Sequence, residues 1–251
     1  MPRMMADSTM ETGNIGGAKG FQFSGVRIEH LGATEYTLVT IAVDVTGSTA
    51  LFADDLRKCL IAAVESCKRS PRSINLLLRV ILFSTSLARG IEELHGFKPL
   101  AEIDPQSYPT FKPSGGTPLF DAMFSVVGAT NAYSKKLMDQ DFLTNGIVFV
   151  ITDGDDTSSV ATTGMIKDEI ERGTRGENIE SLIPILIGIN AGTCKNYLAA
   201  LETEVGMKYK DAGDATPGSL AKVAEFVSRS VSSQSQAVGT GGPSQNVSAT
   251  I

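Results

Sequence analysis

The sequence has no tryptophan, three cysteines and two histidines among its 251 residues. Three cysteines are an odd number at low density and imply no disulfide framework. Two histidines without a Cys-x-x-Cys pair argue against a zinc site. No apolar run approaches the roughly 20 residues that span a membrane. The opening stretch MPRMMADSTM has no apolar signal core. We therefore expect a cytoplasmic protein with no membrane partner.

The sequence also has no excess of basic over acidic residues. Lysine and arginine number 22 against 28 aspartates and glutamates, which gives a formal net charge of −6. Proteins that bind nucleic acids usually carry a basic face, so this balance argues against a nucleic-acid partner. Apolar residues make up 42% of the chain, which is enough for a sizeable core. The length suits either one large domain or one domain with tails.

Composition divides the chain into three parts. Residues 1–20 are rich in Met, Gly and Ser without a period, which predicts a flexible N-terminal segment. Residues 21–232 are expected to form one domain, with its core at 36–232. Residues 233–251 are rich in Ser, Gly and Gln and predict a low-complexity tail. The chain shows neither an internal repeat nor a second core.

Strand and helix patterns alternate along the domain. The stretch YTLVTIAVDV (36–45) is β-branched and apolar on both faces, which is typical of a central parallel strand. Pro184 lies in another such stretch, where we expect irregular pairing because proline lacks the N–H donor. The order predicts an α/β fold with a mostly parallel sheet and helices on both faces. Further strands are expected at 23–31, 74–83, 90–100, 145–154 and 181–190, and helices at 50–69, 117–137, 165–173, 194–202 and 219–230.

Three polar motifs follow these elements at points where loops should meet. They are DVTGS with Asp44, Thr46 and Ser48, SGGTPL with Thr117, and ITDGDD with Asp153. Ligands of such sheets bind at the carboxyl ends of the strands. Two carboxylates and three hydroxyls form an all-oxygen set that suits a hard divalent cation such as Mg²⁺. Because hydroxyls add no negative charge, a bound ion would still accept an anionic ligand from outside.

In this order the three motifs resemble the von Willebrand factor A (vWA) domain and its metal-ion-dependent adhesion site (MIDAS), over about residues 36 to 232. The resemblance implies a Rossmann-like three-layer fold with one short antiparallel edge strand. It implies Mg²⁺ or Mn²⁺ held, directly or through water, by the five residues just named, with a shift between hydroxyl and carboxylate coordination when ligand binds. It also implies a protein partner that supplies a Glu or Asp to the metal. Thr46 stands where the family usually has Ser; its extra methyl stiffens χ1, so we expect metal binding with altered affinity.

The resemblance is closer to small stand-alone bacterial or phage vWA proteins than to integrin or matrix modules, because neither a signal peptide nor disulfides are evident. Bacterial relatives of this size occur in stress-response systems such as tellurium resistance, and in defence or phage settings. Specificity for a partner is expected from the loops at 84–116 and 154–165. No feature of the sequence sets the oligomeric state.

Enzymatic alternatives lack key residues. The chain offers no catalytic nucleophile with a base beside it, so we expect a binding module and not an enzyme. A haloacid-dehalogenase-type phosphatase or phosphotransferase also ends its first strand in aspartate, but its DxDxT motif needs a second aspartate where this chain has Thr46. A receiver domain needs an acidic pair that DVTGS lacks. A vWA scaffold with a non-functional metal site stays open.

Four further charged residues have two interpretations each. Asp155 and Asp156 either belong to a solvent-exposed acidic loop or strengthen the negative electrostatic field around a metal. Asp121 suits a first-turn acid stabilised by the helix dipole, or a support for the site. Arg79 interrupts LLLRVILF, and a buried arginine needs either a sheet edge or an acidic partner.

Overall fold

The computed structural model describes residues 8–16, 20–175, 178–238 and 251. Over these residues one sheet has eight strands in the order β1-β2-β5-β4-β3-β6-β7-β8. The strands are β1 (Met10–Asn14), β2 (Gln22–Val26), β3 (Glu35–Asp44), β4 (Leu76–Phe83), β5 (Ile91–Pro99), β6 (Leu143–Thr152), β7 (Leu182–Gly188) and β8 (Lys208–Asp211). The α-helices are α1 (Ala53–Lys68), α2 (Leu119–Met138), α3 (Thr163–Thr174), α4 (Lys195–Val205) and α5 (Pro217–Ala237).

The sheet is mostly parallel, as the sequence predicted. β3 pairs in parallel with β4 and β6, and the parallel order continues through β7 to β8. β5 runs antiparallel to β4. It is not the last strand on that side, because the antiparallel hairpin β1–β2 continues the sheet beyond it.

Two predicted segment boundaries differ from the structure. β1 lies inside residues 1–20, which the sequence analysis placed outside the domain, and it is held by pairing with β2 and by the burial of Ile15 against the core. α5 continues past residue 232, where Gln234 donates to the carbonyl of Gly146 at 3.2 Å. Neither segment has an apolar period, so contacts distant in sequence decide both boundaries. The rest of the predicted flexible ends, residues 1–7, 17–19 and 239–250, lies outside the described residues.

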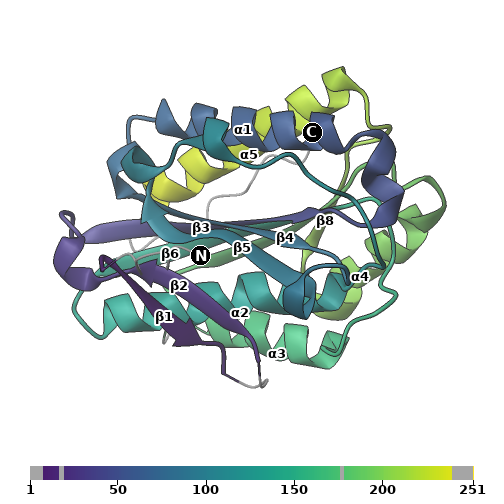
Figure 1. The fold of residues 1–251 in the computed structure, drawn as a ribbon. Coiled ribbons are helices and arrows are strands. Elements are labelled where there is room, and N and C mark those ends of the chain that lie inside the picture. Colours follow the sequence, from purple (N-terminus) through teal and green to yellow (C-terminus); the bar gives the residue numbers. More distant parts are fainter. Residues whose placement is uncertain (1–7, 17–19, 176–177, 239–250) are drawn as a thin grey trace, which may run out of the picture.

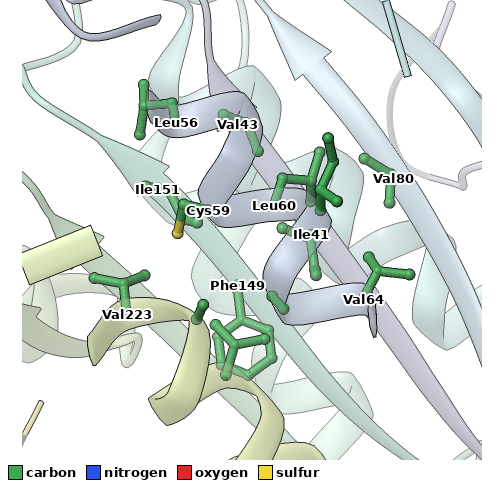
Figure 2. Close-up of a cluster of buried hydrophobic side chains, with 14 of the residues drawn as sticks. Ile41, Val43, Leu56, Cys59, Leu60, Val64, Val80, Phe149, Ile151 and Val223 are labelled. Carbon is green, nitrogen blue, oxygen red and sulfur yellow. The ribbon is translucent and has the colours of Figure 1, made fainter. Parts of the chain in front are cut away.

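Helices cover the two faces of the sheet in separate layers (Figure 1). α1 and α5 lie on one face, and α2, α3 and α4 on the other. Figure 2 shows the first of these layers, where Leu56 and Leu60 of α1 lie over Ile41 and Val43 of β3. Burying one such side chain contributes about 1.5–3 kcal/mol, so the amphipathic pattern of α1 is enough to hold it on this face.

Pro184 does not disturb the sheet. The parallel register of β6 with β7 runs without a shift from Gly146–Leu182 to Thr152–Gly188. On the other side of β7, pairing with β8 begins at Ile185, so no strand lies opposite Pro184 there. The prediction of irregular strand pairing at Pro184 was therefore wrong.

The strand order diverges at one place in the sheet, between β3 and β6. The chain leaves β3 through α1 to reach β4 on one side, and leaves β6 through α3 to reach β7 on the other side. Ligands of open α/β sheets bind where the strand order diverges in this way, outside the carboxyl ends of the strands. Here that place is between the ends of β3 and β6. In the described part of the chain, no helix has the length and apolar character needed to cross a bilayer.

Candidate metal centre

Two aspartates lie side by side at the ends of the central strands. Asp44 is the last residue of β3, and Asp153 follows Thr152, the last residue of β6. The strands pair in parallel with Val43 opposite Ile151, which brings both carboxylates to the same edge. Thr152 links the strand ends directly, because its hydroxyl donates to Asp44 Oδ2 at 2.7 Å.

Hydroxyl groups connect the two carboxylates. The Thr46 N–H donates to Asp44 Oδ1 at 2.8 Å, and Thr46 Oγ1 lies 3.1 Å from Ser48 Oγ. Ser48 in turn donates its hydroxyl to Asp153 Oδ1 at 2.8 Å. Four of the five predicted site residues therefore form one continuous cluster of oxygen atoms.

The fifth residue, Thr117, lies in a loop that packs against the first motif. The N–H of Gly47 donates to the carbonyl of Gly115 at 3.1 Å, and the N–H of Ser114 donates to the carbonyl of Val45 at 3.1 Å. Gly115 has φ of 78°, a left-handed conformation that favours glycine. Within the described residues the Thr117 hydroxyl donates no hydrogen bond to the other four, so its place in the site rests on this contact between loops.

Asp44, Thr46 and Asp153 are buried, whereas Ser48 is exposed. Burial raises the pKa of Asp44 to about 6, against the lowering effect of its hydrogen bonds with Thr46 and Thr152. Burial also raises the pKa of Asp153, although its hydrogen bond with Ser48 acts in the opposite direction. No ion pair with a basic side chain is found for either carboxylate in the described part of the chain. Two buried, unpaired carboxylates fit a site that receives a cation.

The donor set restricts the kind of cation. Carboxylate and hydroxyl oxygens suit hard divalent ions, whereas zinc and copper prefer nitrogen and sulfur ligands. Among the described residues, no three His, Cys, Asp or Glu side chains gather as a metal site. The cluster of Asp44, Thr46, Ser48 and Asp153 therefore depends on its hydroxyls to complete a coordination shell.

Sequence reasoning missed how the loop after β6 is held. Asp156 is not simply solvated: its Oδ1 accepts from the N–H of Phe120 at 3.2 Å, in the first turn of α2. Asp121 is not simply a first-turn acid either, because its Oδ1 accepts from the N–H groups of Val160 at 3.0 Å and Ala161 at 2.7 Å. The loop after β6 is thus fastened to α2, the helix that follows Thr117.

Thr157 fastens the same two segments more closely to the site. The Thr117 N–H donates to Thr157 Oγ1 at 2.8 Å, and the Thr157 N–H donates to the Thr117 carbonyl at 2.9 Å. These residues lie 40 positions apart, and no local pattern in the sequence signals the contact.

Comparisons with known proteins give a fold but no family. No family model matches the chain, and no curated protein matches it. Solved structures do match. The pilus adhesin SpaC from Lactobacillus rhamnosus GG has a TM-score of 0.59 at 11% identity, over 84% of this chain and 31% of that one. The PilB minor pilin from Streptococcus sanguinis has a TM-score of 0.51 at 13% identity, over 83% of this chain and 64% of that one.

A third matching structure holds a metal. Proximal thread matrix protein 1 from the mussel byssus, with a zinc-occupied MIDAS motif, has a TM-score of 0.51 at 13% identity, over 80% of this chain and 47% of that one. At such identities the likeness concerns the fold alone, and it confirms the expected Rossmann-like three-layer α/β fold. The chain spans about a third of the adhesin, about half of the mussel protein and less than two thirds of the pilin.

Proposed function

We propose that the protein is a metal-dependent binding module. The observation that carries this proposal is the continuous cluster of Asp44, Thr46, Ser48 and Asp153 at the end of the central strands. Together with Thr117, these residues would hold Mg²⁺ or Mn²⁺ directly or through water. The ion supplies a Lewis-acidic position that accepts one more oxygen ligand.

The ligand we propose is a Glu or Asp side chain of a partner protein. A carboxylate is the natural anionic ligand for a hard cation whose other ligands include neutral hydroxyls. Two exposed apolar side chains on segments that follow the cluster residues in sequence would add contact area. They are Leu51, three residues after Ser48, and Val160, on the loop fastened to α2. Two neighbours in fold are pilus proteins and a third has an occupied MIDAS motif, which supports an adhesive role.

We further propose that the site does not catalyse a reaction. Thr46 occupies the position at which a haloacid-dehalogenase-type enzyme needs its acid, and its hydroxyl is engaged with Ser48. His95 lies on β5 and bonds through Nε2 to the Tyr108 hydroxyl at 2.8 Å, so it does not face the cluster as a base.

Calorimetric titration tests the metal site. Protein stripped with EDTA and dialysed is titrated with Mg²⁺ and Mn²⁺, as wild type, Asp44→Ala, Asp153→Ala and the control Asp155→Ala. Asp155 is exposed and acidic but outside the cluster. We expect saturable binding in wild type and in the control, and none in the other two variants. Equal binding in all four proteins would place the metal elsewhere, and no binding in wild type would favour a vWA scaffold with a non-functional site.

The cellular setting is a separate proposal. We propose a cytoplasmic protein of a bacterial stress-response, defence or phage system. Its support is that Cys59, Cys67 and Cys194 are all free thiols, as is usual in reducing compartments. Fractionation of the source cells tests it, and recovery at the cell surface, where pilus adhesins act, would contradict it.

A further inference from the structure

A cavity of about 510 Å³ lies beside the loop that carries Thr117. Pro118 and Thr85 form part of its wall, and Thr85 Oγ1 accepts from the N–H of Gly116 at 2.7 Å. From there the cavity extends to the middle of β4 and β5, where Arg79 and Glu93 line it. Its volume falls in the range of sites for small molecules, about 300–1,000 Å³.

A buried arginine lines the inner part of this cavity. Arg79 is 0% exposed, and its Nε donates to Glu93 Oε2 at 2.6 Å. The terminal nitrogens Nη1 and Nη2 have only contacts of 3.4 Å, to Ser125 and to the carbonyl of Gln22. Good N–H···O bonds are about 2.9 Å long. The buried guanidinium therefore retains donors without a close acceptor.

The carboxylates that line the cavity cannot accept hydrogen bonds from all of the Arg79 donors. Glu93 uses Oε2 for Arg79 Nε, and its Oε1 accepts from both the N–H and the hydroxyl of Ser24. Asp121 uses Oδ1 for two backbone N–H groups, which leaves Oδ2. Arg89 adds a second guanidinium at the exposed side, with one contact of 3.4 Å to Gln22 Oε1. The guanidinium N–H groups of Arg79 and Arg89 that lack a close acceptor therefore outnumber the remaining carboxylate oxygen, Asp121 Oδ2.

We propose that this cavity binds a small organic acid whose carboxylate or phosphate group is received by Arg79. The acid would accept short charge-assisted hydrogen bonds from the terminal nitrogens of Arg79, with Arg89 beside it. A hydroxyl or ammonium group on the same molecule would donate to Asp121 Oδ2. The site is distinct from the metal centre, and neither proposal depends on the other.

Thermal unfolding of metal-free protein tests the proposal. The probes are succinate, malate and glycerol 3-phosphate, and succinamide is the uncharged control. We expect at least one acid to raise the unfolding midpoint in a saturable way, and succinamide to have no such effect. Because no divalent ion is present, an acid cannot act by binding to the metal. If none of the acids produces a saturable shift, the proposal is overturned.

Variants then locate the effect. Arg79→Met should weaken binding at least about tenfold, the loss expected for charge-assisted hydrogen bonds. Ser125→Leu should abolish binding by filling the cavity, and the exposed substitution Arg89→Gln should weaken it. Asp44→Ala, which disables the metal centre, should leave it unchanged. If Arg79→Met does not fold, Ser125→Leu and Arg89→Gln decide the question. Wild-type affinity in both of these variants would assign Arg79 and Glu93 a purely structural role.

Discussion

Thr46 is the residue of the site at which this chain departs from the vWA pattern. Its side chain is buried and its Oγ1 lies 3.1 Å from Ser48 Oγ. Thr46→Val keeps the branched shape but removes the hydroxyl, so we expect Mg²⁺ affinity to fall at least about tenfold, as when a group supporting a metal site is removed. Thr46→Ser keeps the hydroxyl and should bind close to wild type. Calorimetry compares the three proteins, and wild-type affinity in Thr46→Val would remove this residue from the proposed ligands.

The three thiols differ in accessibility. Burial raises the pKa of Cys59 and of Cys67 to about 12, so at pH 8 both stay protonated and unreactive. Cys194 is partly exposed. We expect iodoacetamide at pH 8 to modify native protein at Cys194 alone and denatured protein at all three cysteines, as counted by mass spectrometry. Rapid labelling of Cys59 or Cys67 in native protein would contradict the packing of α1.

At the scale of elements, the loop after β6 helps to hold the start of α2. Asp156 Oδ1 accepts the N–H of Phe120, one of the donors that a helix start leaves without a partner inside the helix. Asp156→Ala should lower the free energy of unfolding by about 1 kcal/mol, the usual effect of losing such a cap. Asp155→Ala removes the same charge from the neighbouring exposed residue and should change stability little. Urea denaturation measures both, and equal values would refute the capping role.

The pair formed by Arg79 and Glu93 joins three strands. Glu93 of β5 holds Arg79 of β4 and also accepts from Ser24 of β2. Glu93→Ala leaves a fully buried guanidinium unpaired, which should cost about 3–5 kcal/mol. The double variant Arg79→Met with Glu93→Leu should recover most of that loss, because it removes the buried charge as well. Urea denaturation of the single and double variants tests this, and a Glu93→Ala variant as stable as wild type would show that water solvates Arg79.

At the scale of the whole molecule, metal binding should stabilise the fold. A ligand that binds only the folded state at 100 times its dissociation constant adds about 2.7 kcal/mol. For a chain of this size that corresponds to a rise of about 5–10 °C in the unfolding midpoint. Scanning calorimetry with Mg²⁺ should show this rise, and excess EDTA should reverse it. Asp153→Ala should show no rise; if it rises as wild type does, the stabilising ion binds at another site.

Strand and helix patterns predicted the central part of the fold well but not its edges. β3, β4, β6 and β7 are apolar on both faces, a pattern that only a doubly covered strand requires, and all four were expected. β1 and β8 were not expected, because Met10–Asn14 and Lys208–Asp211 are short and polar. Such edge strands form when a neighbouring strand offers free hydrogen-bonding groups, and their own sequence does not reveal it.

The α/β class, the central strands and the placement of Asp44 and Asp153 at strand ends could all be predicted from the amino-acid sequence. These features follow from local periodicity, because burial of a strand on both faces requires a continuous apolar run. The folded structure was needed to find the links of Asp121 and Asp156 to another segment, the partner of Arg79, and the attachment of β1. Each of these depends on how loops distant in sequence pack together. Polar residues in loops have no period, so their contacts are set once the sheet and helices are in place.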